Sequence, residues 1–204
     1  MTLTETATTA RAGAVNFNQE GTNMNIETLY EMQKELDARI IREKGLEGQD
    51  LLPSTVLALQ VEIGELANEW RGFKHWSNDR EPRTKVEHLV PLCNGYDGNE
   101  IVYKNPLLEE YVDCLHFFLS IARQLDIPAD ELYFHDDTLE GETTTLFTEL
   151  LHNVGMIEGH KFMQNLNTPG GLHNFRKLKL YGAMFIFLRL GEQRLGFTWE
   201  QVAE

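Results

Sequence analysis

Acidic side chains recur at steps of three and four residues in two separate segments of the chain, which on a helix places them along one face. The residues of these two stripes are Glu62, Glu65 and Glu69 in the first segment and Glu110, Asp113 and His116 in the second. Apolar residues surround both stripes, so we expect the helices that carry them to be largely buried. Carboxylates that lie close together in such surroundings cannot all stay ionised without a cation. The pattern therefore predicts a divalent metal site.

A single acidic stripe usually marks nothing more than a solvated helix surface. Two such stripes on apolar helices favour a site instead. Packed helices lie about 8–10 Å apart, so facing stripes bring their carboxylate oxygens within reach of one hard cation such as Mg²⁺. Zinc is disfavoured, because carboxylates rather than His and Cys dominate the candidate ligands.

Four side chains near the stripes each have a structural and a functional interpretation. His116 is either a core histidine satisfied by a neighbour or a site residue, and its position one turn after Asp113 favours the site. Phe117 fits core packing, as aromatic residues at helical spacing usually do. Lys74 and Trp76 are ordinary surface and core residues or, beside a metal, contacts for a phosphate and a base.

Other catalytic motifs are missing from the sequence. Gly170-Gly171 lacks both the lysine and the strand-to-helix context of a phosphate-binding loop. Local signals do not assemble a serine or cysteine nucleophile with a base. Metal chemistry on the acidic stripes therefore remains the best-supported prediction.

Composition narrows the class of protein further. A chain of 204 residues with 42% hydrophobic and 25% charged residues is typical of one folded domain. Its net charge of −14 argues against a nucleic-acid polymer as partner, since the phosphate backbone would be repelled. No apolar run reaches the length that spans a bilayer, so we expect no membrane partner. Cys93 and Cys114 have no metal-type spacing, which favours a reducing, cytoplasmic compartment.

The chain divides into a tail and one domain. Residues 1–25 are rich in Thr, Ala, Gly and Asn without an apolar period, and we expect a flexible N-terminal tail. Residues 26–204 are expected to form a single all-α domain. Its helical period is lost at about 77–105, where Asn94-Gly95 and Asp97-Gly98 predict an inserted loop or a short hairpin.

Capping signals delimit the helices of this domain. The predicted helices cover about residues 25–45, 54–72, 105–125, 142–164 and 173–195, with a brief one at 129–134 and a last one that begins at 199. The start signals are Asn25, Ser54, Asn105-Pro106 and the capping box of Thr198 with Gln201. Gly45, Gly72 and Gly196 supply end signals.

Four stretches together resemble a known family. The two acidic ones are EIGELANEWRGFKHW, with Glu62-x-x-Glu65, and EEYVDCLHFFLS, with Glu110-x-x-Asp113; the others are LYEMQKELDARI and LGFTWEQV. They resemble motifs of the dimeric dUTPases carried by phages of Gram-positive bacteria and by trypanosomatids. That family falls in the all-α NTP pyrophosphatase, or MazG-like, superfamily. The resemblance implies a helical bundle of that type and a homodimer.

The resemblance also implies an activity, Mg²⁺-dependent hydrolysis of dUTP to dUMP and pyrophosphate in the cytosol of a bacterium or a phage-infected host. By this resemblance the metal ligands are Glu62, Glu65, Glu110 and Asp113, and the catalytic carboxylates are Glu65, which orients the water, and Glu62. The implied substrate contacts are Gln33 at the uracil edge, Trp76 and His116 beside the nucleoside, Phe117 where a ribose 2′-hydroxyl would need room, and Lys74 at the phosphates.

Two alternatives to dUTP hydrolysis stay open. One is the same chemistry on another deoxynucleotide such as dCTP. The other is a catalytically weak relative that binds a protein partner. Family members usually continue past the GFTWEQ stretch with a basic segment that contacts the phosphates, whereas the sequence given stops at Glu204. We therefore expect this chain to bind metal and nucleotide but to turn over slowly.

Overall fold

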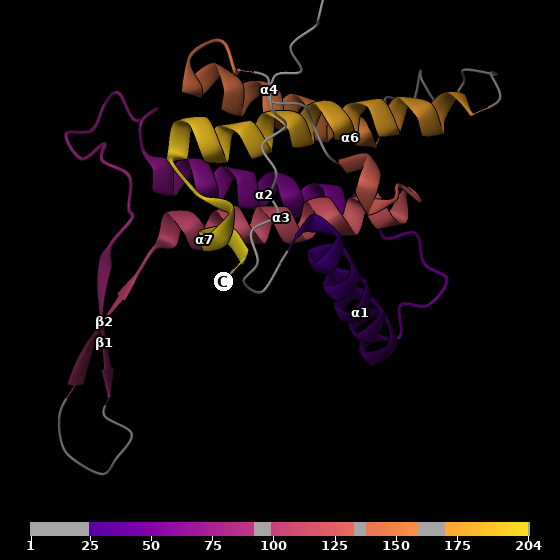
Figure 1. The fold of residues 1–204 in the computed structure, drawn as a ribbon, viewed down its shortest axis with the longest axis horizontal. Helices are drawn as coiled ribbons and strands as arrows, with labels where there is room; N and C mark the ends of the chain where they lie inside the picture. Colours follow the sequence, from indigo (N-terminus) through magenta and orange to yellow (C-terminus); the bar gives the residue numbers. More distant parts are fainter. Residues whose placement is uncertain (1–24, 92–98, 133–137, 159–169, 204) are drawn as a thin grey trace, which may run out of the picture.

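The structure, a computed structural model, describes residues 25–91, 99–132, 138–158 and 170–203. Within these ranges the protein is all-α with one two-stranded antiparallel hairpin (Figure 1). The long helices are α1 (Ile26–Lys44), α2 (Leu52–Trp70), α3 (Pro106–Gln124), α4 (Thr143–Ile157) and α6 (Gly171–Leu190). The shorter elements are β1 (Val86–Pro91), β2 (Asn99–Lys104), a 3₁₀ turn (Ala129–Leu132), a π-helical turn (Gly191–Leu195) and α7 (Trp199–Ala203).

Most of the predicted boundaries agree with these elements. The brief helix expected at 129–134 is the 3₁₀ turn, and the helix expected at 173–195 is α6 followed by the π-helical turn. Helix α4 ends at Ile157 with Glu158 as its C-cap, and residues 159–164 of the range predicted for it lie outside the described residues. The predicted tail, apart from Asn25, also lies outside them. In the part of the chain that is described, no helix is long and apolar enough to cross a membrane.

Side-chain caps begin three of the helices as predicted. The Oδ1 atom of Asn25 accepts a hydrogen bond from the Thr28 N–H at 2.9 Å, and that of Asn105 accepts one from the Leu108 N–H at 3.2 Å. The capping box before α7 is also confirmed. Gln201 Oε1 accepts from the Thr198 N–H at 3.0 Å, and Thr198 Oγ1 accepts from the Gln201 N–H at 3.4 Å.

The start of α2 corrects one prediction. Ser54 is not the N-cap, because the helix begins earlier, at Leu52, whose N–H donates to Asp50 Oδ1 at 3.2 Å. Pro53 then lies in the first turn, where its missing N–H costs no helical hydrogen bond. At the other end, Arg71 has φ 64° and ends the helix, and a Cβ at Gly72 would lie 2.3 Å from the Trp70 ring.

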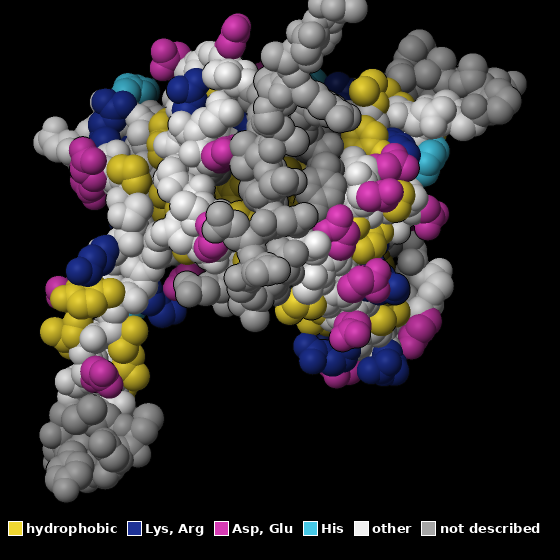
Figure 2. Space-filling view, viewed as in Figure 1, with side chains coloured by type: hydrophobic (Ala, Val, Ile, Leu, Met, Phe, Trp, Pro, Cys, Tyr) yellow, Lys and Arg dark blue, Asp and Glu magenta, His cyan; other side chains and the backbone are white. Residues whose placement is uncertain are grey.

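The insert forms the short hairpin that the turn signals predicted, although residues 92–98, which carry those signals, lie outside the described residues. Strands β1 and β2 pair from Val86 with Lys104 to Pro91 with Asn99. The hairpin extends away from the helices, and Figure 2 shows hydrophobic side chains on it. Leu89 and Ile101 face each other across the ladder and are 67% and 50% exposed.

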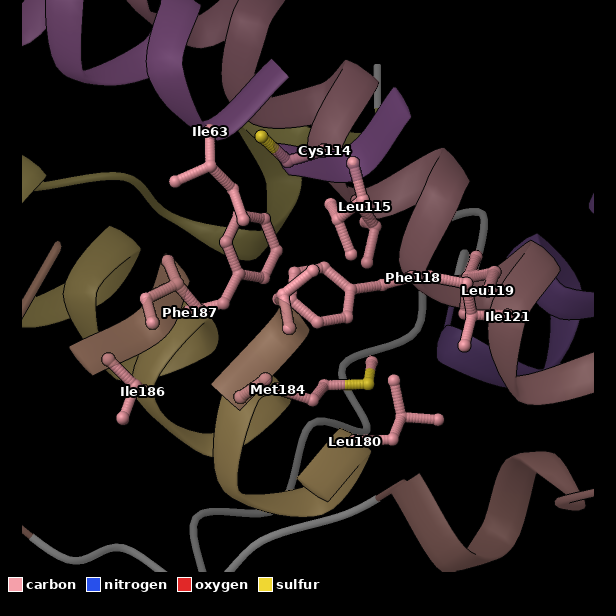
Figure 3. Close-up of a cluster of buried hydrophobic side chains, with 14 of the residues drawn as sticks. Ile63, Cys114, Leu115, Phe118, Leu119, Ile121, Leu180, Met184, Ile186 and Phe187 are labelled. Atoms are coloured by element: carbon pink, nitrogen blue, oxygen red, sulfur yellow. The ribbon is translucent and has the colours of Figure 1, made fainter. Parts of the chain in front are cut away.

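The core lies between two pairs of helices. Helix α2 packs along α3, α4 packs along α6, and α2 also contacts α4. At the centre, the rings of Phe118 and Phe187 have centroids 4.8 Å apart (Figure 3). The ring of Tyr111 stacks on that of Phe187, with centroids 4.2 Å apart. Ile63 of α2 and Cys114 of α3 are fully buried beside them. These contacts set the depth and the rotation of α2 and α3, the two helices that carry the acidic stripes.

Helix α1 is packed differently from the other long helices. It contacts α3 and the 3₁₀ turn (Figure 1), and its only buried residues are Ile26 and Gln33. Two of its apolar residues, Met32 and Ile40, are 53% and 43% exposed. An apolar period thus predicted the helix correctly but not how much of it is buried within this chain.

Candidate active site

Three of the predicted acids form a cluster between α2 and α3. One carboxylate oxygen each from Glu62, Glu65 and Glu110 lies within 4.8 Å of the other two. Glu62 and Glu110 are half-buried, and Glu65 is exposed. The buried residue Ile63 turns into the core next to Glu62, which leaves the carboxylates at the edge of the helix interface. The acids therefore lie at the rim of the core. The sequence had suggested that they lie inside it.

Asp113, the fourth predicted ligand, is exposed on α3 and does not belong to this group of three. Its charge still acts on the cluster, because it raises the pKa of both Glu62 and Glu110. Asp113 is one turn beyond Glu110 on the same helix. The structure thus places it beside the cluster without bringing its oxygen into the tight set.

The cluster is electrostatically unfavourable without a cation. Burial, followed by the charges of Glu65 and Asp113, raises the pKa of Glu110 from 4.5 to about 7. Burial and the same two acids also raise the pKa of Glu62. Converging carboxylates with raised pKa values are what a divalent cation would relieve, since oxygen ligands at short range match Mg²⁺. The donor set fits the metal that the sequence predicted.

Glu69, the third acid of the first stripe, has a different environment. Its carboxylate pairs with Arg83 at 3.2 Å, and its backbone carbonyl accepts a hydrogen bond from the Arg83 N–H at 3.0 Å. The carbonyl of Arg83 in turn accepts from the Leu107 N–H at 3.1 Å. Glu69 therefore joins the end of α2 to the start of α3, and its charge is neutralised within the chain.

Two of the predicted substrate contacts bind each other. His116 Nδ1 lies 2.7 Å from Gln33 Oε1, a contact that joins α3 to α1. Gln33 is only 5% exposed, whereas His116 is exposed. The Nε2 group of Gln33 donates to Asp37 Oδ1 at 2.7 Å and to Ser120 Oγ at 2.9 Å. Both polar atoms of the Gln33 amide are therefore already hydrogen-bonded within the chain.

Three further residues complete this network, and none of them was predicted from the sequence. Ser120 Oγ donates to Asp37 Oδ1 at 2.8 Å, and the Arg123 guanidinium pairs with Asp37 Oδ2. One local signal was present, because Gln33 and Asp37, like His116 and Ser120, are four residues apart and so share a helix face. We name Gln33, Asp37, His116, Ser120 and Arg123 the amide network.

Lys74 and Trp76 lie in the turns that follow α2. The Lys74 ammonium donates to Asn68 Oδ1, and it lies 5.8 Å from the centre of the Phe73 ring. Trp76 is 68% exposed, with its ring edge-on to Phe73 at 5.7 Å and to His75 at 4.9 Å. An exposed indole and an ammonium held only at the surface are both open to a ligand.

Phe117 is half-buried and packs against the core. It also lines a cavity of about 460 Å³ between α1, α2 and α3, together with Asp37, Ile40, Leu52 and Ser120. The core interpretation of Phe117 and the ligand interpretation are therefore compatible, because one part of the ring packs while another borders open space.

The fold and the cluster together define an all-α protein with a carboxylate site suited to a hard divalent cation. Residues 25–89 and 99–204 match the protein family described as dUTPase. The chain belongs to this family, the all-α dUTPases, which are hydrolases that act on nucleotides. Comparisons with curated proteins and with solved structures found no match.

Proposed function

We propose that this protein hydrolyses dUTP to dUMP and pyrophosphate in a Mg²⁺-dependent reaction. The observation that carries the proposal is the convergence of Glu62, Glu65 and Glu110, whose carboxylate oxygens lie within 4.8 Å of one another. Membership of the dUTPase family supports the reaction class. A cluster of unneutralised acids would otherwise repel a triphosphate, so the site suits this substrate only together with a cation.

Glu62, Glu65, Glu110 and Asp113 would hold the metal. When bound there, Mg²⁺ neutralises charge on phosphate oxygens and lowers the pKa of a bound water. Glu65 is the exposed member of the cluster and is suited to orient the attacking water and accept its proton, with Glu62 beside it. Access is open on the side of Glu65, which is exposed.

We assign the contacts with the nucleoside and with the phosphates to residues that flank the cluster. The exposed Trp76 indole is suited to stack on the base, and Lys74 to pair with a phosphate. Phe117 borders the cavity where it would exclude a ribose 2′-hydroxyl. His116, the exposed member of the Gln33–His116 pair, is suited to contact the base, and the buried Gln33 holds it from behind.

We further propose that the protein acts as a homodimer in the cytosol. Support for the dimer comes from apolar side chains that remain exposed on α1 and α2, namely Met32, Ile40, Leu57 and Val61, with exposed fractions of 43% to 62%. Such side chains on neighbouring helices are typical of an interface between subunits. Cys114 is a free buried thiol, which is compatible with a reducing compartment.

The test is release of pyrophosphate from dUTP, dCTP, dTTP and UTP with Mg²⁺ and with excess chelator. We expect dUTP to be the preferred substrate and chelation to abolish the reaction. A preference for dCTP would identify dCTP as the substrate in place of dUTP and leave the proposed reaction unchanged. Hydrolysis that continues unchanged in chelator would contradict the assigned role of the acid cluster.

A second candidate function, binding of a protein partner by a catalytically weak enzyme, is favoured by the hairpin. Its residues Leu89, Ile101 and Tyr103 are 50% to 67% exposed, and the two strands extend away from the helices. An exposed apolar patch of this kind marks an interaction surface more often than a catalytic one. Failure to hydrolyse any of the four nucleotides, together with intact Mg²⁺ binding, would favour this candidate.

A further inference from the structure

The amide network contains a chain of hydrogen bonds with a defined direction. Arg123 donates to Asp37, and an ionised carboxylate can only accept hydrogen bonds. The Ser120 hydroxyl has one proton, which it donates to Asp37, whose Oδ1 and Oδ2 lie 2.8 and 3.0 Å away. Only lone pairs therefore remain on Ser120 Oγ for its contact with Gln33 at 2.9 Å. Both neighbours on this side of the Gln33 amide are acceptors.

This direction fixes the orientation of the Gln33 amide. The NH₂ group must face Asp37 and Ser120, because the reverse orientation would place Oε1 against two acceptors. Gln33 and Ser120 are each 5% exposed, so water cannot compensate for such a mismatch. The Oε1 atom consequently faces His116, whose Nδ1 lies 2.7 Å away and must carry a proton.

A neutral imidazole with its proton on Nδ1 presents a lone pair at Nε2. The two nitrogens lie on different edges of the ring, so Nε2 points away from the buried contact with α1. His116 is exposed and lies one turn beyond Asp113 and two turns beyond Glu110 on α3. Because His116 is exposed, the free acceptor at Nε2 is open to a ligand on the surface of α3, the helix that also carries Glu110 and Asp113.

We infer that Asp37 and Ser120 are positioning residues that hold His116 as a hydrogen-bond acceptor through Gln33, so that the site selects a base that offers an N–H, uracil, over one that offers a lone pair, cytosine. The inference rests on the proposed function, because it assumes that the nucleotide binds beside the acid cluster.

The chemistry of the two bases explains the selection. Uracil carries a hydrogen on N3, whereas N3 of cytosine is an acceptor. An acceptor at His116 Nε2 pairs with the first and repels the second, and a mismatch of this kind at a hydrogen-bonding site is a basis for discrimination between the two bases. A network with the opposite direction would place the proton on Nε2 and favour cytosine. Asp37 and Ser120 thus control specificity without contact with the base.

The first experiment measures the tautomer directly and does not depend on turnover. Two-bond ¹H–¹⁵N spectra of ¹⁵N-histidine-labelled protein at about pH 8 distinguish a proton on Nδ1 from one on Nε2, and His116→Gln identifies the His116 signals. We expect the Nδ1–H form in the unmodified protein. The Nε2–H form there would overturn the inference whether or not the protein hydrolyses dUTP.

The second experiment tests the consequence for specificity. Asp37→Asn and Ser120→Ala each weaken the constraint on the Gln33 amide, because each changes one of the two acceptors that its NH₂ group faces. Glu35→Gln is the matched control, since it removes an exposed acid from the same helix, α1. We expect the ratio of kcat/KM for dUTP over dCTP to fall about tenfold in the two variants. The control should keep the ratio of the unmodified protein.

If the unmodified protein turns over neither nucleotide, the proposed function fails, and the ratio of Kd values for the non-hydrolysable α,β-imido analogues of dUTP and dCTP replaces the kinetic ratio. Circular dichroism identifies any variant that does not fold. An unchanged ratio in a folded Asp37→Asn or Ser120→Ala protein would overturn the inference, and a reduced ratio with a shift of the His116 signals toward Nε2–H would support it.

Discussion

The acid cluster and the amide network both join α3 to a neighbouring helix, but they differ in how hydrogen-bond donors and acceptors face each other. In the cluster, acceptors face acceptors, since Glu62, Glu65 and Glu110 bring three carboxylates within 4.8 Å. In the network each buried acceptor meets a donor, from Arg123 through Asp37 to Gln33. The first arrangement needs a charge from outside the chain, whereas the buried part of the second is satisfied within the chain.

This difference separates two tasks. An incomplete polar site can bind a ligand strongly, because the ligand relieves repulsion that the folded chain has to tolerate. A complete and buried site resists rearrangement and is suited to hold a neighbouring group in one orientation. We therefore expect substitutions in the cluster to change catalysis and metal binding, and substitutions in the network to change selectivity.

The largest expected effect is on turnover. Glu62→Gln or Glu110→Gln should lower kcat for dUTP by on the order of a hundredfold or more, because each removes one anionic ligand from the cluster. Release of pyrophosphate in saturating Mg²⁺ measures the effect. Near-normal activity in a folded variant would show that the cluster is not the metal site.

A smaller effect is expected on the discrimination between deoxyribose and ribose. Phe117→Ala should reduce the preference for dUTP over UTP by about tenfold, because it removes the ring that borders the cavity and would exclude a 2′-hydroxyl. The ratio of kcat/KM for the two nucleotides measures this. Phe117 also packs on the core, so the variant should melt at a lower temperature; a lower melting temperature with an unchanged ratio would leave Phe117 with a packing role alone.

The raised pKa of Glu110 should make the stability of the metal-free protein depend on pH. Because the pKa of Glu110 is about 7 in the folded protein against 4.5 ordinarily, the folded state binds more protons than the unfolded state between these values. The free energy of unfolding of the metal-free protein should therefore fall as pH rises from about 4.5 to about 7. The Glu110→Gln variant should lose part of this dependence.

Added Mg²⁺ should counteract that fall. At about ten times its Kd the ion contributes about 1.4 kcal/mol of stability, which corresponds to a rise in Tm of roughly 3–5 °C for a chain of this size. The rise should be larger at pH 8 than at pH 5.5, since protons compete for the carboxylates at the lower pH. Thermal unfolding followed by circular dichroism measures both values, and an equal rise in Glu110→Gln would contradict the assignment.

The smallest effect is expected at Glu69, an acid of the same stripe that the chain itself neutralises. Glu69→Gln should leave kcat within about twofold and the Mg²⁺-induced rise in Tm unchanged, because the pair with Arg83 at 3.2 Å makes this carboxylate a structural contact. Loss of the Mg²⁺ effect in this variant would extend the metal site along α2. The pairing with Arg83 would then have to open when the ion binds.

Local spacing determined much of this protein from the sequence alone. Periods of three and four residues predicted the helices, and the caps at Asn25, Asn105 and Thr198 began them where expected. The same spacing placed Glu62 with Glu65 on one helix face and Glu110 with Asp113 on another. These features are local, because hydrogen bonds and side-chain neighbours within a helix depend only on residues a few positions apart.

Only the tertiary structure decided which helix faces meet. Packing of Ile63 and Phe118 into the core sets the rotation of α2 and α3, and that rotation brings Glu110 to the two acids of α2 while Asp113 stays outside the tight group. It also pairs Glu69 with Arg83 and brings Gln33 of α1 to His116 of α3, across 83 positions of sequence. A helical period fixes which residues share a face, but the depth and rotation of that face follow from the core as a whole.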